Sequence, residues 1–502
     1  MESKPVFNSV VILTFTMLLV KVLSAIYRVP YQNILGDTGL YAYQQVYPII
    51  AIVSVLSLNA IPSVVSQSRY SNAFMKQLHV WLFVISVLLL ISTALCSEQV
   101  AQMMGDRALS GMLKVSALVL LPFPFVSLAR GILQKRHMME QIAISQVIDQ
   151  VIRVGTILIA ILLYVNIDLT VYDSGVISIL GSFLGLSGAF VYLKYKGIRI
   201  TDNETNISEE GSHYRQFITL IFFYSLSYLV LIIWQLVDSF TIINQLKQVM
   251  SLNEARDLKG IYDRGSSLIQ VGLIVTTSFS LVLIPVLAKC KHDDDVKNMQ
   301  SYASSALKIT LIFSSAAAVG LMNLIIPLNL FLFKTANGYE ALAIYMISVI
   351  FVSLIIMFTA MLQIFNAYKV QVVAVAIGVM VKLMLNVIMV QQFNIVGASI
   401  ATVAGLFMYA AILYLKVKAL YDLSLNTFLV RWIGTLIVMS VLIQCVLLIP
   451  FDSRMQAMGV SLIGIVIGLI IVLYAMIRWK IISIDEWHHL PFGNVMIKFM
   501  KE

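Results

Sequence analysis

The apolar segments of this chain form two series that repeat each other, and some of their polar residues repeat with them. Residues 192–196 read YLKYK near the end of the sixth segment, and residues 414–418 read YLKVK near the end of the twelfth. Other equivalent residues recur at offsets of 222, 229 and 223 positions, which relate Gly175 to Gly397, Arg153 to Lys382 and Pro62 to Pro285. Three similar offsets in chain order predict two halves of one fold, residues 1–200 and 212–420.

The apolar content of the chain is too high for a soluble globular protein. Apolar residues make up 60% and charged residues 12% of the 502 residues, and the mean hydropathy is +0.92. A membrane-spanning helix needs about 20 mostly apolar residues. Fourteen segments meet this condition: 8–27, 42–66, 78–97, 111–133, 142–164, 174–195, 215–237, 265–288, 304–326, 340–366, 368–390, 395–416, 428–449 and 456–478.

These segments predict an all-α polytopic membrane protein with about 14 transmembrane helices. We expect two six-helix lobes in a pseudo-twofold repeat, residues 1–200 and 212–420. Two accessory helices follow within residues 427–478, and residues 479–502 form a cytoplasmic tail.

Lysine and arginine residues in the connecting segments predict the orientation. With the N-terminus in the cytoplasm, the inside segments hold 20 of the 34 basic residues and the outside segments hold 9. We therefore expect both termini in the cytoplasm. The net charge of +9 is explained by this asymmetry, so no nucleic-acid partner is expected.

The first apolar segment carries two cations on one helical face. Lys21 and Arg28 are seven residues apart, about 10 Å of helical rise, and Pro30 ends or kinks the helix just beyond them. A charge in the membrane interior costs at least ~2.5–3.5 kcal/mol on insertion scales, so it usually faces protein or water. Arg28 is also compatible with snorkelling to the outer headgroups. Lys21 is too deep for that, and we interpret the pair as the lining of an aqueous cavity.

The fifth apolar segment carries an acid and a base four residues apart. Asp149 precedes Arg153, which is the favourable order for an intrahelical ion pair. A structural pair is the simpler interpretation, and a proton- or cation-coupling role for Asp149 is the alternative. In the eleventh segment, Lys382 and Asn386 have no nearby acid in sequence. Lys382 must therefore find a partner on another helix, a water-filled cavity or an anionic ligand.

A run of mixed charge joins the seventh and eighth apolar segments. Residues 239–264 are interpreted as a solvated helical extension on the outer side of the membrane. Asp238 and Arg264 stand at its membrane ends, and we expect them to reach inward as gate or cavity residues.

A cluster of tyrosines follows the first apolar segment: Tyr31, Tyr41, Tyr43 and Tyr47. An interfacial aromatic belt explains such a cluster. A cavity that binds sugars is the alternative, because it would use the same rings.

The residues that usually bind metals are few and scattered. Cys96, Cys290 and Cys445 lie far apart, which predicts neither a disulfide nor a metal site. The adjacent His488 and His489 lie in the tail without further ligands. We expect no bound metal and no organic cofactor. Transport would be driven by a coupling ion, Na+ or H+, or by the membrane potential.

Two stretches of the chain resemble a known family of bacterial membrane proteins. The first is KVLSAIYRVPYQNILGD, residues 21–37, followed by Tyr47-Pro48 and Ile61-Pro62. The second is QVIDQVIRV, residues 146–154, preceded by RGILQ at residues 130–134. They resemble polysaccharide transporters of the stage V sporulation protein B type. These belong to the multidrug/oligosaccharidyl-lipid/polysaccharide (MOP) exporter superfamily, which also contains the lipid II flippases.

This resemblance implies two six-helix lobes that alternate between inward- and outward-facing states in the bacterial cytoplasmic membrane. It also implies a cationic cavity for the pyrophosphate and sugar of an undecaprenyl-linked precursor, with Lys21, Arg28 and Arg264 as its cations. Lipid II flippases carry a further cation in the second span, where this chain has no Lys or Arg between Gln44 and Gln67. The sugar therefore stays open between lipid II and another cell-wall polysaccharide unit.

The balance of embedded charges also favours an anionic cargo. The embedded bases outnumber the acids: Lys21, Arg130, Arg153, Lys308 and Lys382 against Asp149. We predict a flippase for a lipid-linked anionic sugar, with Lys382 as a further cavity residue, that works as a monomer among membrane lipids. A cation-coupled multidrug antiporter of the same fold is the alternative. A membrane glycosyltransferase or polymerase would need catalytic carboxylates and usually a sizeable outer loop, so we expect no enzymatic activity.

Overall fold

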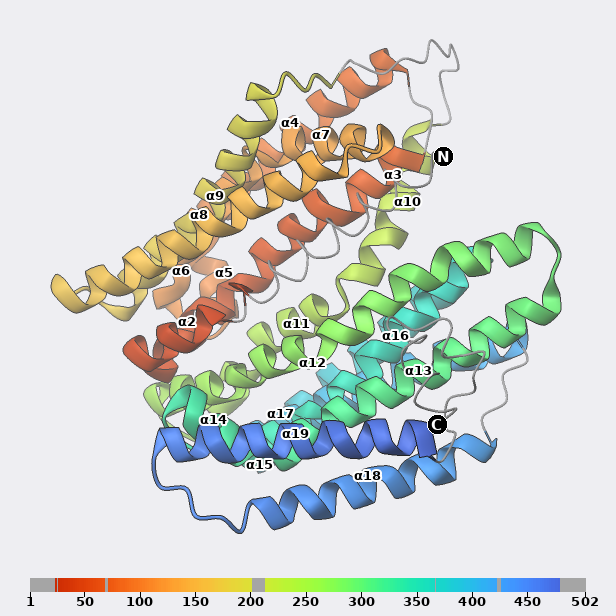
Figure 1. Cartoon of the computed structure of the whole chain (residues 1–502). Coiled ribbons are helices and arrows are strands. Elements are labelled where there is room, and N and C mark those ends of the chain that lie inside the picture. The colour runs from red at the N-terminus through yellow and green to blue at the C-terminus, as the bar shows by residue number, and fades with distance from the viewer. Residues whose placement is uncertain are drawn as a thin grey trace. The chain divides into compact units, whose positions relative to one another are not determined.

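The computed structural model describes residues 23–24, 26–67, 71–200, 213–365, 367–421 and 426–478. Almost all of these residues are helical, and no β-strand occurs among them (Figure 1). The predicted all-α fold class is therefore confirmed.

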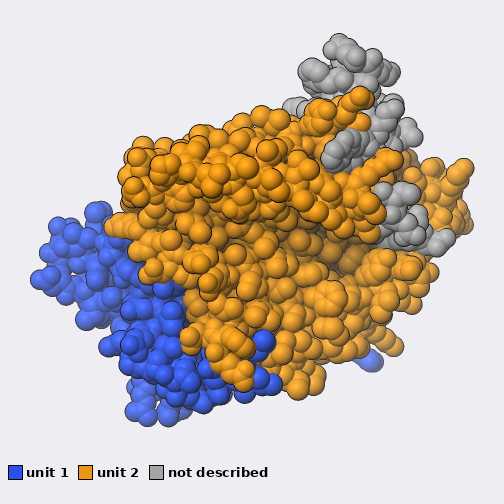
Figure 2. All heavy atoms as spheres, turned by 90° about the horizontal axis from the view of Figure 1, so that it is seen from below, with its two compact units in different colours: residues 1–263, 386–391 blue, residues 264–385, 392–502 orange. Residues whose placement is uncertain are grey.

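The chain divides into two compact units, which Figure 2 distinguishes by colour. The first unit is Met1–Asp263 with Asn386–Gln391, and the second is Arg264–Leu385 with Gln392–Glu502. The predicted lobe boundaries, residues 1–200, 212–420 and 427–478, stay a prediction. The predicted tail, residues 479–502, lies outside the described residues.

The helices of the first unit are α2 (Arg28–Val55), η1 (Leu56–Ala60), α3 (Ile61–Gln67), α4 (Asn72–Leu95), α5 (Ser97–Met103), η2 (Arg107–Leu109), α6 (Ser110–Ser116), η3 (Ala117–Leu120), α7 (Phe123–Lys135), α8 (Met139–Asn166), α9 (Val171–Tyr195), α10 (His213–Tyr228) and α11 (Val230–Leu246). Helix α12 (Leu252–His292) begins in the first unit and continues into the second. The second unit adds α13 (Val296–Asn323), α14 (Ile325–Phe333), α15 (Tyr339–Met346), α16 (Ser348–Ile364), α17 (Tyr368–Tyr421) apart from Asn386–Gln391, α18 (Asn426–Val446) and α19 (Arg454–Arg478).

Within the described ranges, nine helices are long and apolar enough to cross a membrane, or up to eleven if each sharply bent pair is one span. The predicted count of fourteen therefore stays a prediction. One reason for the difference is α17, which contains two predicted spans, 368–390 and 395–416, in one element. It is interrupted at Asn394, whose φ is +50°.

The chain reverses direction inside α2 at Gly36. The rings of Tyr27 and Tyr43 lie 5.9 Å apart, although 16 residues of continuous helix would separate them by about 24 Å. Gly36 makes the reversal with φ +73°, a conformation that glycine adopts without the steric cost of a side chain. The segment therefore forms a helical hairpin whose two arms face each other.

Helices α8 and α9 pack side by side because α9 presents glycines to α8 (Figure 1). A Cβ atom at Gly185 would lie 2.4 Å from the backbone oxygen of Asp149. A Cβ at Gly181 would lie 3.0 Å from the backbone oxygen of Arg153. Small residues allow helix backbones to approach closely in membranes. The part of α8 that carries Asp149 and Arg153 therefore packs directly against α9.

The accessory helices α18 and α19 pack against each other and against α13 and α14 of the second unit. Their contact has an apolar core that includes Phe428, Trp432 and Val472. The Trp432 indole N–H also donates a hydrogen bond to the Ser315 hydroxyl (2.8 Å). The two helices thus form part of the folded second unit.

Candidate functional site

Arg28 lies at the start of the α2 hairpin and is completely buried. Its guanidinium carbon lies 5.9 Å from the Tyr27 ring centroid and 5.3 Å from that of Tyr47. Aromatic rings attract a cation through their quadrupole, more strongly once water is excluded. Snorkelling to the headgroups is therefore the wrong interpretation of Arg28. Lys21, its predicted partner, lies outside the described residues.

The tyrosines of the α2 hairpin are packed inside the protein. Tyr31, Tyr41 and Tyr43 have no exposed surface, and only Tyr47 is half-buried. The Tyr31 and Tyr43 rings lie 5.4 Å apart. The preferred interpretation as an interfacial belt is wrong, because the reversal at Gly36 brings the rings of the two arms together.

The mixed-charge segment at the start of α12 is also largely buried on one face. Lys259 forms an ion pair of 2.5 Å with Asp263, and their side chains are only 3% and 9% exposed. A Cβ atom at Gly260 would lie 2.0 Å from the backbone oxygen of Asp37, and Thr38 donates a hydrogen bond to Asp257. The interpretation as a solvated extension is therefore wrong for this face, because it packs against the α2 hairpin.

Asp238, on α11, is buried within the first unit. Its carboxylate accepts hydrogen bonds from the Tyr262 hydroxyl (3.1 Å) and the Asn386 amide (3.1 Å). The same amide nitrogen donates to the Thr241 hydroxyl (2.8 Å). Asp238 is therefore buried, and its role as a gate or cavity residue stays a prediction.

The second unit buries two of the predicted cavity cations. Arg264 donates to the Asn329 side-chain oxygen (3.0 Å) and the Thr335 hydroxyl (3.0 Å), and its guanidinium lies 5.4 Å from the Phe333 ring centroid. The Lys382 ammonium donates to the Thr402 hydroxyl at 2.7 Å. Neither Arg264 nor Lys382 has any exposed surface. Each cation therefore has neutral oxygen atoms among its partners.

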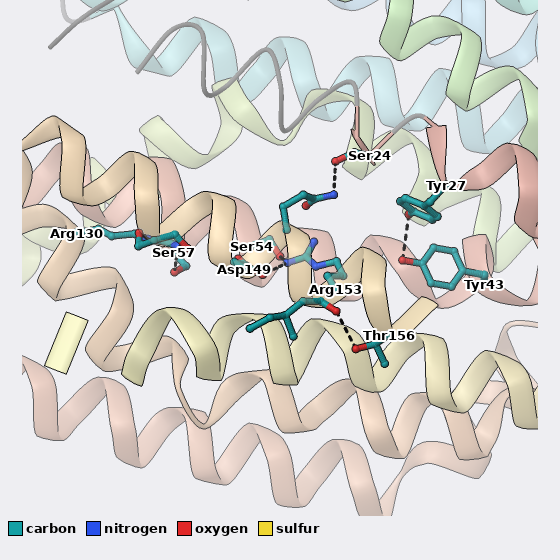
Figure 3. Close-up of polar contacts among 12 residues, drawn as sticks. Ser24, Tyr27, Tyr43, Ser54, Ser57, Arg130, Asp149, Arg153 and Thr156 are labelled. Carbon is teal, nitrogen blue, oxygen red and sulfur yellow. Dashed lines mark hydrogen bonds and ion pairs between the residues drawn. The ribbon is translucent and has the colours of Figure 1, made fainter. Parts of the chain in front are cut away.

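Asp149 and Arg153 form the ion pair that their spacing predicts, at 2.9 Å (Figure 3). Arg153 also lies 3.5 Å from the hydroxyl of Ser54 on α2. Nearby, Arg130 of α7 donates to the Ser145 hydroxyl (3.1 Å) and the Ser57 hydroxyl (3.3 Å). Ser57 belongs to η1, a five-residue π-helix, and such segments often occur at functional sites. Arg130, Arg153 and Asp149 therefore form one group of charges within the first unit.

A cluster around Asp106 was not predicted from the sequence. The Arg256 guanidinium donates to both carboxylate oxygens (2.8 and 2.9 Å), and Tyr41 (3.1 Å) and Tyr172 (2.6 Å) donate from their hydroxyls. Burial opposes ionisation of Asp106, but the hydrogen bonds from Arg256 and Tyr172 hold its pKa below the ordinary value. The four residues come from four separate parts of the chain, so no local pattern indicates that they meet. They tie α12 to the rest of the first unit.

Replacing either member of the Asp149–Arg153 pair should reduce the amount of folded protein. Asp149→Asn or Arg153→Gln leaves one charge buried without its partner, which typically costs roughly 3–5 kcal/mol. We expect the double variant to recover much of the yield of monodisperse protein, measured by size-exclusion chromatography from solubilised membranes. A double variant that folds well but no longer transports would instead assign Asp149 to ion coupling.

Comparisons with known proteins place the chain in a family. A family model for polysaccharide biosynthesis proteins matches residues 6–291. YabM, an uncharacterized membrane protein of Bacillus subtilis (strain 168), is 33% identical over 519 residues, which cover 99% of this chain and 97% of YabM. The lipid II flippase MurJ of the same organism is 23% identical over 407 residues, covering 73% of this chain and 74% of MurJ.

Solved structures share the fold. An inward closed conformation of a lipid II flippase MurJ superposes with a TM-score of 0.69 at 18% identity, covering 94% of this chain and all of that chain. An inward-facing multidrug resistance MATE family transporter of the MOP superfamily superposes with a TM-score of 0.62 at 13% identity, covering 82% and 98%.

The fold is thus that of MOP superfamily transporters, a class of multi-pass membrane proteins. The chain belongs to the polysaccharide biosynthesis protein family. The relatives and solved structures whose activity is named are flippases and transporters, not enzymes. This agrees with the prediction from the sequence that the protein is not an enzyme.

Proposed function

We propose that this protein is a flippase that moves an undecaprenyl-pyrophosphate-linked sugar precursor across the cytoplasmic membrane by alternating access. The main support for the proposal is the excess of buried basic side chains over buried acidic ones. Among the described residues, six basic side chains are buried: Arg28, Arg130, Arg153, Lys259, Arg264 and Lys382. Three carboxylates are buried among the same described residues: Asp106, Asp238 and Asp263.

This balance suits an anionic headgroup better than a cationic drug. Charge-assisted hydrogen bonds from Arg and Lys to phosphate are among the strongest in proteins, and they strengthen where water is excluded. We assign binding of the pyrophosphate to Lys21 and Arg28 of the first unit and Arg264 of the second. Lys382 helps to transfer the headgroup during the cycle. The similarity to MurJ, which is named a lipid II flippase, supports the same class of cargo.

Transport needs no organic cofactor, and Na+, H+ or the membrane potential drives it. The protein works as a monomer. Both of its termini lie in the cytoplasm, as the distribution of basic residues predicts. The sugar is that of lipid II or of another cell-wall polysaccharide unit.

Proteoliposomes test the proposal. The purified chain should accelerate flipping of lipid II or of an undecaprenyl pyrophosphate carrying another sugar, measured by access of a membrane-impermeant reagent to the headgroup. Cells that overproduce the protein should gain no resistance to cationic dyes. Dye efflux that requires Asp149 and is unaffected by loss of Arg28 would instead establish a cation-coupled multidrug antiporter.

A further inference from the structure

Lys259 is a buried cation of the first unit that has no role in the site assigned so far. It lies in the third turn of α12, and its ammonium contacts Asp263 at 2.5 Å and lies 5.3 Å from the Tyr262 ring centroid. Arg28 and Asp238 are electrostatic neighbours of the same Asp263 carboxylate. Lys259 therefore belongs to the same group of charges as Arg28, the predicted pyrophosphate ligand.

The Lys259–Asp263 pair is poorly suited to a purely structural role. In an intrahelical pair, the favourable order places the acid before the base, and here the base comes first. Withdrawing both charges from water also costs free energy that their attraction often fails to recover. The first turns of α12 are held by other contacts, namely the close approach of Gly260 to Asp37 and the hydrogen bond from Thr38 to Asp257.

Acids and bases are equal in number among four residues of this group in the first unit. Arg28 and Lys259 supply two positive charges, and Asp238 and Asp263 supply two negative charges. An incoming diphosphate adds negative charge and competes with a carboxylate for a cation such as Lys259, whose counter-anion is Asp263. Arg28 is packed against two tyrosine rings. Lysine, by contrast, carries a compact charge on a flexible stem and can exchange one oxygen partner for another.

We propose that Lys259 is a second phosphate-binding cation of the first unit, and that Asp263 acts as its counter-anion while no substrate is bound. The inference rests on the proposed function and deepens it. When the pyrophosphate of the lipid-linked sugar arrives, the Lys259 ammonium exchanges the Asp263 carboxylate for a phosphate oxygen. Arg28 binds the same group from the α2 hairpin.

Binding of undecaprenyl pyrophosphate to the purified full chain in nanodiscs tests this assignment. Lys259→Met should weaken binding by about tenfold or more, the effect of losing a charge-assisted hydrogen bond. Asp263→Asn should bind at least as tightly as the wild type, because it frees Lys259. The double variant Lys259→Met/Asp263→Asn leaves no unpaired charge from this pair, so it should be as stable as the wild type to heat and still bind as weakly as Lys259→Met.

The double variant separates the proposal from a purely structural pair. If the double variant binds undecaprenyl pyrophosphate like the wild type while Arg28→Gln does not, Lys259 is no ligand and only this inference is overturned. If the wild-type chain itself fails to bind undecaprenyl pyrophosphate, the proposed function fails with it. The exposed pair Lys114–Glu98, at 3.8 Å, supplies the matched control, and Lys114→Met/Glu98→Gln should leave binding unchanged.

Discussion

Replacing Arg28 with Gln should abolish precursor flipping while leaving the amount of protein in the membrane unchanged. The variant removes a buried guanidinium that lies close to the rings of Tyr27 and Tyr47 and keeps a shorter, neutral polar side chain. The variant loses two charge-assisted hydrogen bonds to the diphosphate. We expect the flipping rate to fall at least about 100-fold, which corresponds to an activation free energy higher by ~2.7 kcal/mol. The measurement is the flipping rate in proteoliposomes.

Two further variants make the Arg28 result specific. Arg28→Lys keeps the charge and loses the planar, two-pronged geometry, so it should retain an intermediate rate. Lys114→Gln removes a cation from a half-exposed side chain and should flip at the wild-type rate. A buried charge with no role in transport would give the opposite result, with Arg28→Gln as active as the wild type and no less stable.

Replacing Asp106 with Asn should strongly destabilise the protein. Asp106 accepts two hydrogen bonds from Arg256 and one each from Tyr41 and Tyr172. Without the carboxylate, the Arg256 charge loses its partner in a largely buried position, which costs roughly 3 kcal/mol. The measurement is thermal unfolding of the purified protein in detergent.

Matched variants isolate the Asp106–Arg256 interaction. The double variant Asp106→Asn/Arg256→Gln should be more stable than Asp106→Asn, since no unpaired charge remains. Glu98→Gln, in the exposed pair with Lys114, should change stability by less than ~1 kcal/mol. Equal effects of Asp106→Asn and Glu98→Gln would contradict the assignment.

The pH dependence of this interaction follows from the direction of its pKa shift. The pKa of Asp106 is lowered in the folded state, where burial is outweighed by hydrogen bonds from Arg256 and Tyr172. Such a group contributes stability above its unfolded pKa, about 3.9 for aspartate, and the contribution is lost as pH falls through the folded pKa. The difference in unfolding temperature between the wild type and Asp106→Asn should therefore persist from neutral pH to about pH 5 and disappear only in strong acid.

The amino-acid sequence by itself determined the helical membrane class and one local interaction of the site. Apolar segments of about 20 residues leave few alternatives to spanning helices, because the backbone must satisfy its hydrogen bonds internally. The Asp149–Arg153 pair was predictable because residues four apart on a helix are neighbours whatever the tertiary structure. Burial of Lys382 followed from its place among apolar residues.

Only the tertiary structure decided which residues far apart in sequence meet. The carboxylate of Asp106 accepts hydrogen bonds from side chains of α2, α9 and α12. Lys259 is buried because Gly260, one residue further along α12, allows the helix to approach the backbone at Asp37. Helical spacing specifies which residues share a face, but burial of that face depends on which other helix packs against it. For Tyr31 and Tyr43, that partner is the other arm of their own hairpin, brought back by the reversal at Gly36.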